Sequence, residues 1–222
     1  GPEENTPGAW SDFEYDFSGS TFFYPIDLTN SYYAKPINFS GSTYEGEAYF
    51  SGSTYQGWAY FSGSTYQALA DFTDSTYNDV ADFSGSIFYQ KVYFGADGDN
   101  SSFSRFTDCA PQFYDETNHK NTLFSSPDND FTVENGRGYP IYRSLDGLPL
   151  GCKFLTSEQK EYLADKFQEI DETNNKLPEA KDNKEKAKLL DTLRSLNEEL
   201  HKWREKVTTV KVEGTALGED DN

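Results

Sequence analysis

Large apolar residues, nearly all of them aromatic, recur along residues 17–94 at intervals that alternate strictly between five and six. A small residue stands two positions before most of them, such as Ser42 before Tyr44 and Ala48 before Phe50. Residues i and i−2 of a strand point the same way, so each large residue shares a face with its small neighbour. An 11-residue repeat of this kind predicts a solenoid or a stacked sheet rather than a catalytic site.

Turn-forming pairs such as Ser40-Gly41 separate successive large residues and predict corners. The pattern of a small residue, any residue, an aromatic, any residue and Gly or Asp, as in Ala81-Asp82-Phe83-Ser84-Gly85, resembles the pentapeptide-repeat family. The run from Ala110 to Phe124 is similar to the last, degenerate coils of bacterial members. The resemblance covers residues 15–131 and implies a mainly β fold, a right-handed quadrilateral β-helix with four faces per coil.

This chain departs from the family pattern by a sixth residue on alternate faces. Four faces then span 22 residues, and the extra residue forms a bulge at the same two corners of every coil. Stacking of the coils predicts four columns in the core: Phe17, Phe39, Phe61 and Phe83; Leu28, Phe50, Phe72 and Phe94; Phe22, Tyr44, Tyr66 and Phe88; and Tyr33, Tyr55 and Tyr77. A buried hydroxyl without a partner costs about 1–3 kcal/mol. We therefore expect the tyrosine hydroxyls to bond corner backbone groups or to emerge at the six-residue faces.

Two other folds fit the same repeat. A flat solenoid with one 11-residue coil per turn has two faces, but its interior is thin for aromatic rings on both sides. Tandem hairpins are the other alternative, because Tyr44-Glu45-Gly46-Glu47 and Tyr55-Gln56-Gly57-Trp58 resemble the opening of MORN repeats. The later paired glycines of that pattern are missing here.

Flanking segments have different compositions. Residues 1–14 indicate a loose arm, of which Trp10 or Phe13 is expected to cover the open end of the coil. Gly1-Pro2 resembles a protease scar, and the absence of methionine suggests a piece of a longer protein. Residues 132–153 are turn-rich and are expected to pack on the other end of the coil, with Tyr139, Ile141, Leu148 and Leu150 buried.

Residues 154–210 change to a helical period. Thr156 and Gln159 form a predicted capping box, and Pro178 suits the first position of a second helix. The first helix presents Leu163, Phe167, Ile170 and Leu177, and the second has a heptad seam of Leu189, Leu193, Leu196, Leu200, Trp203 and Val207. The two helices form either a hairpin that covers the C-terminal end of the coil or a coiled coil between chains. Residues 211–222 are an acidic tail.

Charge constrains the partners. The net charge is −19, and residues 1–100 contain 14 acidic and only two basic side chains. An acidic rod is repelled by nucleic acid and anionic membranes, so another protein, or a second copy through residues 154–210, is the expected partner. No apolar run is long enough to span a membrane. Cys109 and Cys152 are too few for a disulfide framework and are expected to be reduced, and a cytoplasmic location is favoured.

We predict no catalytic, cofactor-binding or metal-binding residues. Asp97, Asp99 and Asn100 suggest a calcium loop, but Asp108 stands where an EF-hand requires a bidentate glutamate. His119 has no ligand-type neighbours and is expected at a surface or corner. The sequence therefore predicts a non-enzymatic structural or interaction module. The alternative, which rests on the family resemblance, is an acidic DNA mimic that binds a type II topoisomerase.

Overall fold

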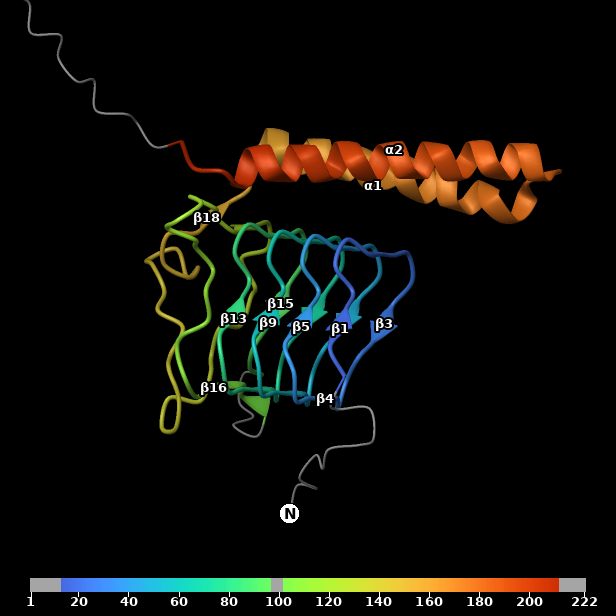
Figure 1. The fold of residues 1–222 in the computed structure, drawn as a ribbon. Coiled ribbons are helices and arrows are strands. Elements are labelled where there is room, and N and C mark those ends of the chain that lie inside the picture. The colour runs from blue at the N-terminus through green and yellow to red at the C-terminus, as the bar shows by residue number, and fades with distance from the viewer. Residues whose placement is uncertain (1–12, 97–101, 212–222) are drawn as a thin grey trace, which may run out of the picture.

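The computed structural model describes residues 13–96 and 102–211, in which short strands wind into a four-walled β-solenoid (Figure 1). Each wall is a parallel sheet of two-residue strands. We name the walls A to D in chain order. Wall A contains β1 (Tyr15–Asp16), β5 (Ile37–Asn38), β9 (Ala59–Tyr60) and β13 (Ala81–Asp82). Wall B contains β2 (Thr21–Phe22), β6 (Thr43–Tyr44), β10 (Thr65–Tyr66), β14 (Ile87–Phe88), β17 (Leu123–Phe124) and β18 (Lys153–Phe154). Wall C contains β3 (Ile26–Asp27), β7 (Ala48–Tyr49), β11 (Ala70–Asp71) and β15 (Val92–Tyr93), and wall D contains β4 (Tyr32–Tyr33), β8 (Thr54–Tyr55), β12 (Thr76–Tyr77) and β16 (Arg105–Phe106).

The register between coils confirms the predicted solenoid. Thr43 pairs with Thr65, and Ile37 pairs with Ala59, so equivalent residues of successive regular coils are 22 positions apart. Because the paired strands are parallel, the antiparallel hairpins of a MORN-like fold are wrong for this chain. A flat coil of 11 residues per turn is also wrong, because it would pair residues 11 positions apart.

Aromatic rings fill the interior in four stacked columns. Within a column the rings are nearly parallel: the centroids of Tyr44 and Tyr66 lie 4.7 Å apart at an interplanar angle of 3°. Between columns the rings meet edge to face, as for Phe50 and Phe61 at 5.3 Å and 81°. Both geometries are favourable for aromatic quadrupoles. The first coil is the exception, because Phe17 is 37% exposed there.

The tyrosine hydroxyls do not behave as expected. The hydroxyls of Tyr44, Tyr55, Tyr66 and Tyr77 are buried and make no hydrogen bond within the described residues. Nearby serines use their own hydroxyls elsewhere, since Ser64 Oγ accepts from Ser42 N at 3.1 Å and donates to the Phe39 carbonyl at 3.2 Å. The serines thus tie successive coils together, and burial raises the pKa of the Tyr66 phenol well above its usual range.

Corners follow the two spacings. Five-residue intervals turn at Ser-Gly pairs whose second residue is left-handed, as at Gly41 (φ 64°) and Gly63 (φ 60°). Six-residue intervals turn more widely after walls B and D. At one of these corners a Cβ on Gly46 would lie 2.4 Å from the nitrogen of Pro25 in the preceding coil, so only glycine fits.

The C-terminal end is closed by an irregular coil whose aromatic residues continue the four columns: Phe106, Phe113, Phe124 and Phe131. Longer connections join its faces, and Thr76 pairs with Arg105 instead of a residue 22 positions on. Ile141 and Leu148 are buried over this coil, as predicted. Tyr139 and Leu150 are not, because they are 47% and 56% exposed.

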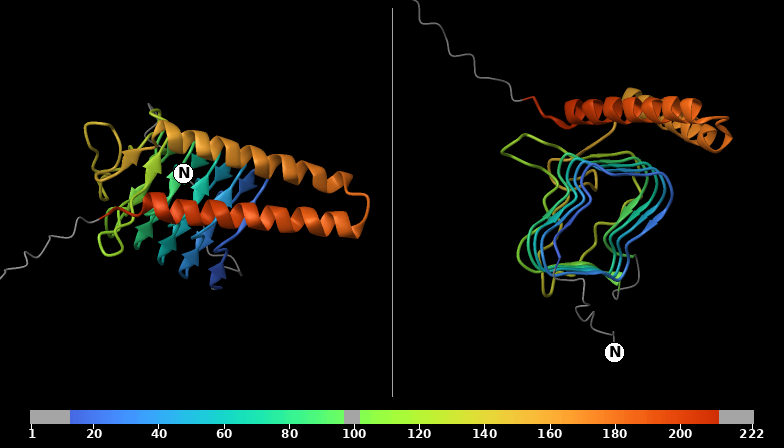
Figure 2. Two further views of the ribbon diagram at one scale, coloured as in Figure 1. Left: turned by 90° about the horizontal axis from the view of Figure 1, so that it is seen from above. Right: turned by 45° about the vertical axis from the view of Figure 1, so that its right-hand side comes forward.

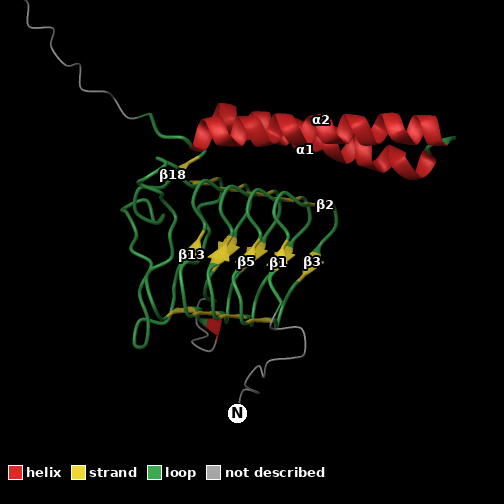
Figure 3. Ribbon diagram, viewed as in Figure 1, coloured by secondary structure: helices red, strands yellow, loops and turns green. Residues whose placement is uncertain are grey.

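The helical segment forms a hairpin of α1 (Ser157–Lys176), the 3₁₀ turn η2 (Leu177–Glu179) and α2 (Asn183–Thr208) (Figure 3). The predicted capping box of Thr156 and Gln159 begins α1. Pro178 lies in η2 instead of opening the second helix, which is capped by Asp182. The hairpin runs along the solenoid axis over wall B, so the expectation that it covers the C-terminal end is wrong (Figures 1 and 2).

The N-terminal end is only partly described. Trp10, one of two residues expected to cover it, lies outside the described residues. Phe13, the other, is 54% exposed. The tip of the hairpin, around η2, extends beyond the first coil (Figure 1).

Candidate interaction surfaces

Apolar contacts hold the hairpin against the C-terminal half of wall B. Outward side chains Ile87 and Leu123 are buried in one cluster with residues of both helices. The ring of Phe167 on α1 meets Tyr89 edge to face at 5.3 Å. The seam of α2 belongs to the same cluster, with Leu193, Leu196 and Leu200 buried and Trp203 and Val207 half-buried. This part of the seam is therefore used within the chain.

Polar contacts fasten the end of α2 to the irregular coil. Lys120 Nζ lies 2.6 Å from Glu205 Oε2. The amide of Asn121 donates to the Thr208 carbonyl at 2.7 Å. His119 is exposed, has a left-handed backbone (φ 54°) and accepts from the Val210 amide at 2.8 Å, which agrees with its predicted place at a corner. We call this half of the hairpin, with Ile87 and Leu123 beneath it, the root.

The N-terminal half of wall B is polar. Its outward residues are Thr21, Thr43 and Thr65, and the corners beside them are glycines. Arg204 of α2 is fully buried and donates from Nη1 to Thr65 Oγ1 at 3.0 Å. Desolvation lowers the pKa of the Arg204 guanidinium to about 10. We call this half of the wall, together with the hairpin segment that runs from Asp171 through η2 to Arg204, the tip.

A carboxyl pair lies under α1 in the tip. Glu45 follows Tyr44 at a corner of the coil and is only 8% exposed. Burial, and then the hydrogen bond and negative charge of Asp171 on α1, raise the pKa of Glu45 to about 8. Near neutral pH the Glu45 carboxyl is therefore largely protonated beneath α1.

A cleft separates α2 from the first two coils. Its volume is about 440 Å³. The floor consists of Gly19, Thr21, Gly41 and Thr43. The side chains of α2 that line it are Arg194, Asn197, Glu198, His201, Lys202 and Arg204.

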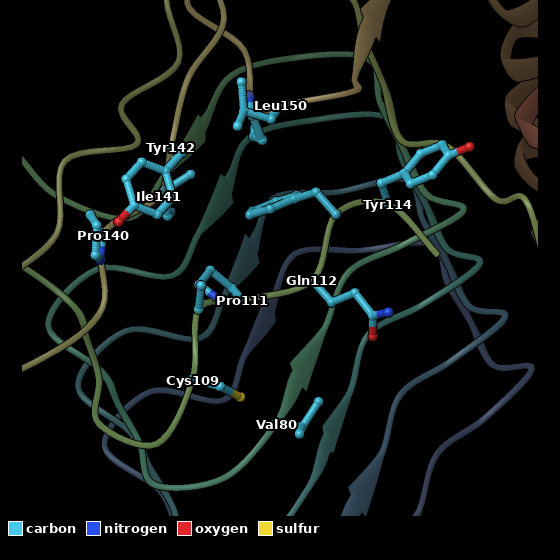
Figure 4. Close-up of a pocket in the computed structure, with 12 residues that line it drawn as sticks. Val80, Cys109, Pro111, Gln112, Tyr114, Pro140, Ile141, Tyr142 and Leu150 are labelled. Atoms are coloured by element: carbon cyan, nitrogen blue, oxygen red, sulfur yellow. The ribbon is translucent and has the colours of Figure 1, made fainter. Parts of the chain in front are cut away.

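An apolar hollow of about 390 Å³ lies at the other end of the molecule (Figure 4). Its walls come from three parts of the chain, because residues 109–114, 140–142 and 149–150 meet there with Val80. Prolines 111, 140 and 149 line it, and the rim side chains Tyr142 and Leu150 are 65% and 56% exposed. A rigid hollow with an exposed apolar rim suits the insertion of a partner's side chain.

Most outward carboxylates of walls A and C have a structural role. Asp71 Oδ1 accepts from the amide and the hydroxyl of Thr73 at 2.9 and 2.7 Å, and Asp82 binds Ser84 in the same way. These contacts form the Asx turns that lead into the corners. Part of the negative charge of the chain thus stabilises the turns of the solenoid.

The described residues contain no group of three or more metal-ligating side chains, and Asp97, Asp99 and Asn100 of the considered calcium loop lie outside them. Cys109 and Cys152 are both free. Within the described ranges no helix is long and apolar enough to cross a membrane.

Comparisons with known proteins give no match: no family model, no curated protein and no solved structure resembles this chain closely enough to be identified. The structure is a repetitive parallel β-solenoid with a helical pair. The fold suggests a structural or protein-interaction module.

Proposed function

We propose that this chain is a non-enzymatic protein-interaction module and a variant of the pentapeptide-repeat family. The four-walled coil and its inner columns support the family assignment. Support for a non-enzymatic role comes from the serines, the most numerous candidate nucleophiles. Ser64 and Ser75, for example, hydrogen-bond the main chain of the preceding coil and are buried.

The apolar hollow carries the proposal, because exposed apolar side chains gather there on a rigid support. Leu150 and Tyr142 lie on its rim, whereas the tip cleft is lined mainly by polar and charged groups. The proposed partner is a protein, either another one or a second copy, that inserts an apolar side chain. In this proposal the helical hairpin only covers wall B. The partner binds at the irregular C-terminal coil and not at the heptad seam of α2.

A matched pair of variants tests this. Leu150→Asp places a charge on the rim, while Leu145→Asp changes a leucine of the same segment that is more exposed (107% against 56%) and lies outside the hollow. Sedimentation velocity over a range of concentrations reports self-association, and pull-downs with both variants as bait report another protein. We expect Leu150→Asp alone to abolish the complex. Equal behaviour of wild type and both variants in both assays would refute the hollow as the contact.

The alternative function is the topoisomerase-binding DNA mimic. Wall C alternates Asp27, Tyr49, Asp71 and Tyr93 in its outward column, so its carboxylates recur every second coil. With coils about 4.7–4.9 Å apart, that spacing is about 9–10 Å, whereas duplex DNA has one charge per about 1.7 Å of axis. A gyrase pull-down at low salt tests the alternative, and absence of binding there would end it.

A further inference from the structure

Within the part of the chain that the structure describes, Arg204 is a buried cation without an acidic partner of its own. Its guanidinium is fully buried, bonds Thr65 through Nη1 and contacts His201 Nδ1 through Nη2. Its Nε has no hydrogen-bond partner within the described residues. Glu205 is the nearest acid along α2 and offsets part of the charge, but its carboxylate bonds Lys120 at 2.6 Å. Burying a charge without a dedicated counterion is costly, so this arrangement calls for a function.

The tip cleft opens beside this cation and is itself positive. Arg194 and Lys202 line it together with Arg204, against the carboxylate of Glu198, and Arg194 also pairs with Asp191 at 3.1 Å. This excess is unusual in a chain with a net charge of −19. A low-dielectric wall on one side focuses the field of such charges into the cleft.

The floor of the cleft provides room and hydrogen-bonding groups. Gly19 and Gly41 have no side chains, and Thr21 and Thr43 carry hydroxyls that can donate to an anion. The volume of about 440 Å³ is within the range of small-molecule sites.

We propose that the tip cleft binds a small oxyanion, a molecule with a carboxylate or phosphate group. Lys202 and Arg194 contact the anion at the mouth, and the threonine hydroxyls donate to it from the floor. Arg204 supplies positive potential from beneath. The site is separate from the apolar hollow, so the inference does not depend on the proposed interaction function.

Calorimetric titration of the full chain at low ionic strength tests the site, with inorganic phosphate and acetate as separate probes. We expect saturable binding of at least one probe with one site per chain, and the tighter probe identifies the group. Lys202→Gln should weaken binding about threefold to tenfold. Lys206→Gln makes the same charge change one turn further along α2, on an exposed residue outside the cleft, and should alter affinity less than twofold. No saturation by either probe at millimolar concentrations, or an equal loss in both variants, would overturn the proposal.

Arg204 provides a second test. Arg204→Lys keeps the charge and should retain binding within about threefold, whereas Arg204→Met removes the charge at similar volume and should abolish it. Circular dichroism establishes whether each variant is folded. A folded Arg204→Met protein with wild-type affinity would also contradict the proposal, and if that variant does not fold, Lys202→Gln and Arg204→Lys decide.

Discussion

The root and the tip of the hairpin rest on the same wall of the same repeat, yet they are held by different forces. At the root, Ile87 and Leu123 occupy the outward column of wall B and are buried by Phe167 and its neighbours. At the tip, Thr43 and Thr65 occupy that column, and the contacts are the buried Arg204, the protonated Glu45 beneath α1 and the partly buried ring of Phe23. Apolar burial is non-directional and strong, whereas polar contacts across an interface stabilise only when every group is paired.

The difference between root and tip shows how a solenoid of uniform coils can form a cleft at one end. Successive coils are about 4.7–4.9 Å apart, whereas successive helical turns are about 5.4 Å apart. A straight helix laid along the axis therefore moves steadily out of phase with the coils. Close packing is present over the root, where the outward column of wall B holds Ile87 and Leu123, and beyond Thr65, where it holds threonines, the cleft lies between α2 and the first two coils.

The largest expected effect comes from the root. Ile87→Ala removes buried methyl groups under both helices and should lower the free energy of unfolding by about 2–5 kcal/mol. Thr43→Ala, at the equivalent position two coils away, should cost about 1 kcal/mol or less, because it faces the cleft. Urea unfolding of the two variants measures the difference, and equal losses would abolish the distinction between root and tip.

The second effect is on pH dependence and belongs to the tip. Because the pKa of Glu45 is raised from its ordinary 4.5 to about 8, the folded protein binds more protons than the unfolded chain between these values. Stability therefore falls as pH rises from about 4.5 to about 8, by an amount on the order of a few kcal/mol. Glu45→Gln should remove most of this fall in urea unfolding at pH 5 and pH 8.5.

Hydrogen exchange of backbone amides tests whether the loss of stability at high pH is confined to the tip. In the wild-type protein at pH 8.5, exchange should accelerate around Asp171 and along the start of α2, while amides near Phe167 remain protected. If protection is lost equally along both helices, Glu45 does not act on the tip alone. If wild type and Glu45→Gln have the same pH dependence, the raised pKa of Glu45 is not the cause of the fall in stability.

Most of the solenoid could be predicted from the sequence because each coil repeats the same local rule. A large residue such as Phe61 determines its own face, the Ser-Gly pair determines the corner, and the 22-residue coil follows from alternating intervals. The irregular coil is less regular in sequence, but Phe113 and Phe124 still mark its faces. Which residues enter the four inner columns depends on patterns among near neighbours in the chain, and a single sequence contains those patterns in full.

The hairpin position and both hollows could not be predicted in this way, because they depend on contacts between distant segments. Nothing near Thr65 in the sequence indicates that Arg204 packs on it. The apolar hollow joins residues around Pro111, Pro140 and Leu150 that share no pattern. One sequence feature does indicate where the hairpin packs. The aliphatic residues Ile87 and Leu123 lie on the outer side of wall B, and aliphatic side chains on an outer face indicate that another element covers that face. The expectation for the tyrosine hydroxyls is wrong because serines such as Ser64 use their own hydroxyls for bonds between coils.

The covered wall B and the open wall D can also be compared on their inner sides. Tyr66 lies in the covered wall B and Tyr55 in the open wall D, and both hydroxyls are buried without partners within the described residues. Replacing either by phenylalanine removes an unsatisfied group without a cavity, so stability should rise by about 1–2 kcal/mol. The melting temperature should increase by about 2–8 °C. A fall in either variant would mean that the hydroxyls are satisfied in solution.

The smallest effect compares the two helix caps. Thr156 Oγ1 accepts from the Gln159 amide at 3.2 Å at the root, and Asp182 Oδ1 accepts from the Glu185 amide at 2.8 Å at the tip. Loss of an N-cap costs about 1 kcal/mol where the helix is coupled to the whole fold. Thr156→Ala should therefore lower the global free energy of unfolding by about 1 kcal/mol.

Asp182→Ala should lower the global free energy of unfolding by less than about half of that, because the first turn of α2 lies in the overhanging tip and can open locally. Faster exchange of the Glu185 amide, with little change in the urea midpoint, is the expected result for Asp182→Ala. Equal global losses in the two variants would show that the tip is as firmly coupled to the coil as the root.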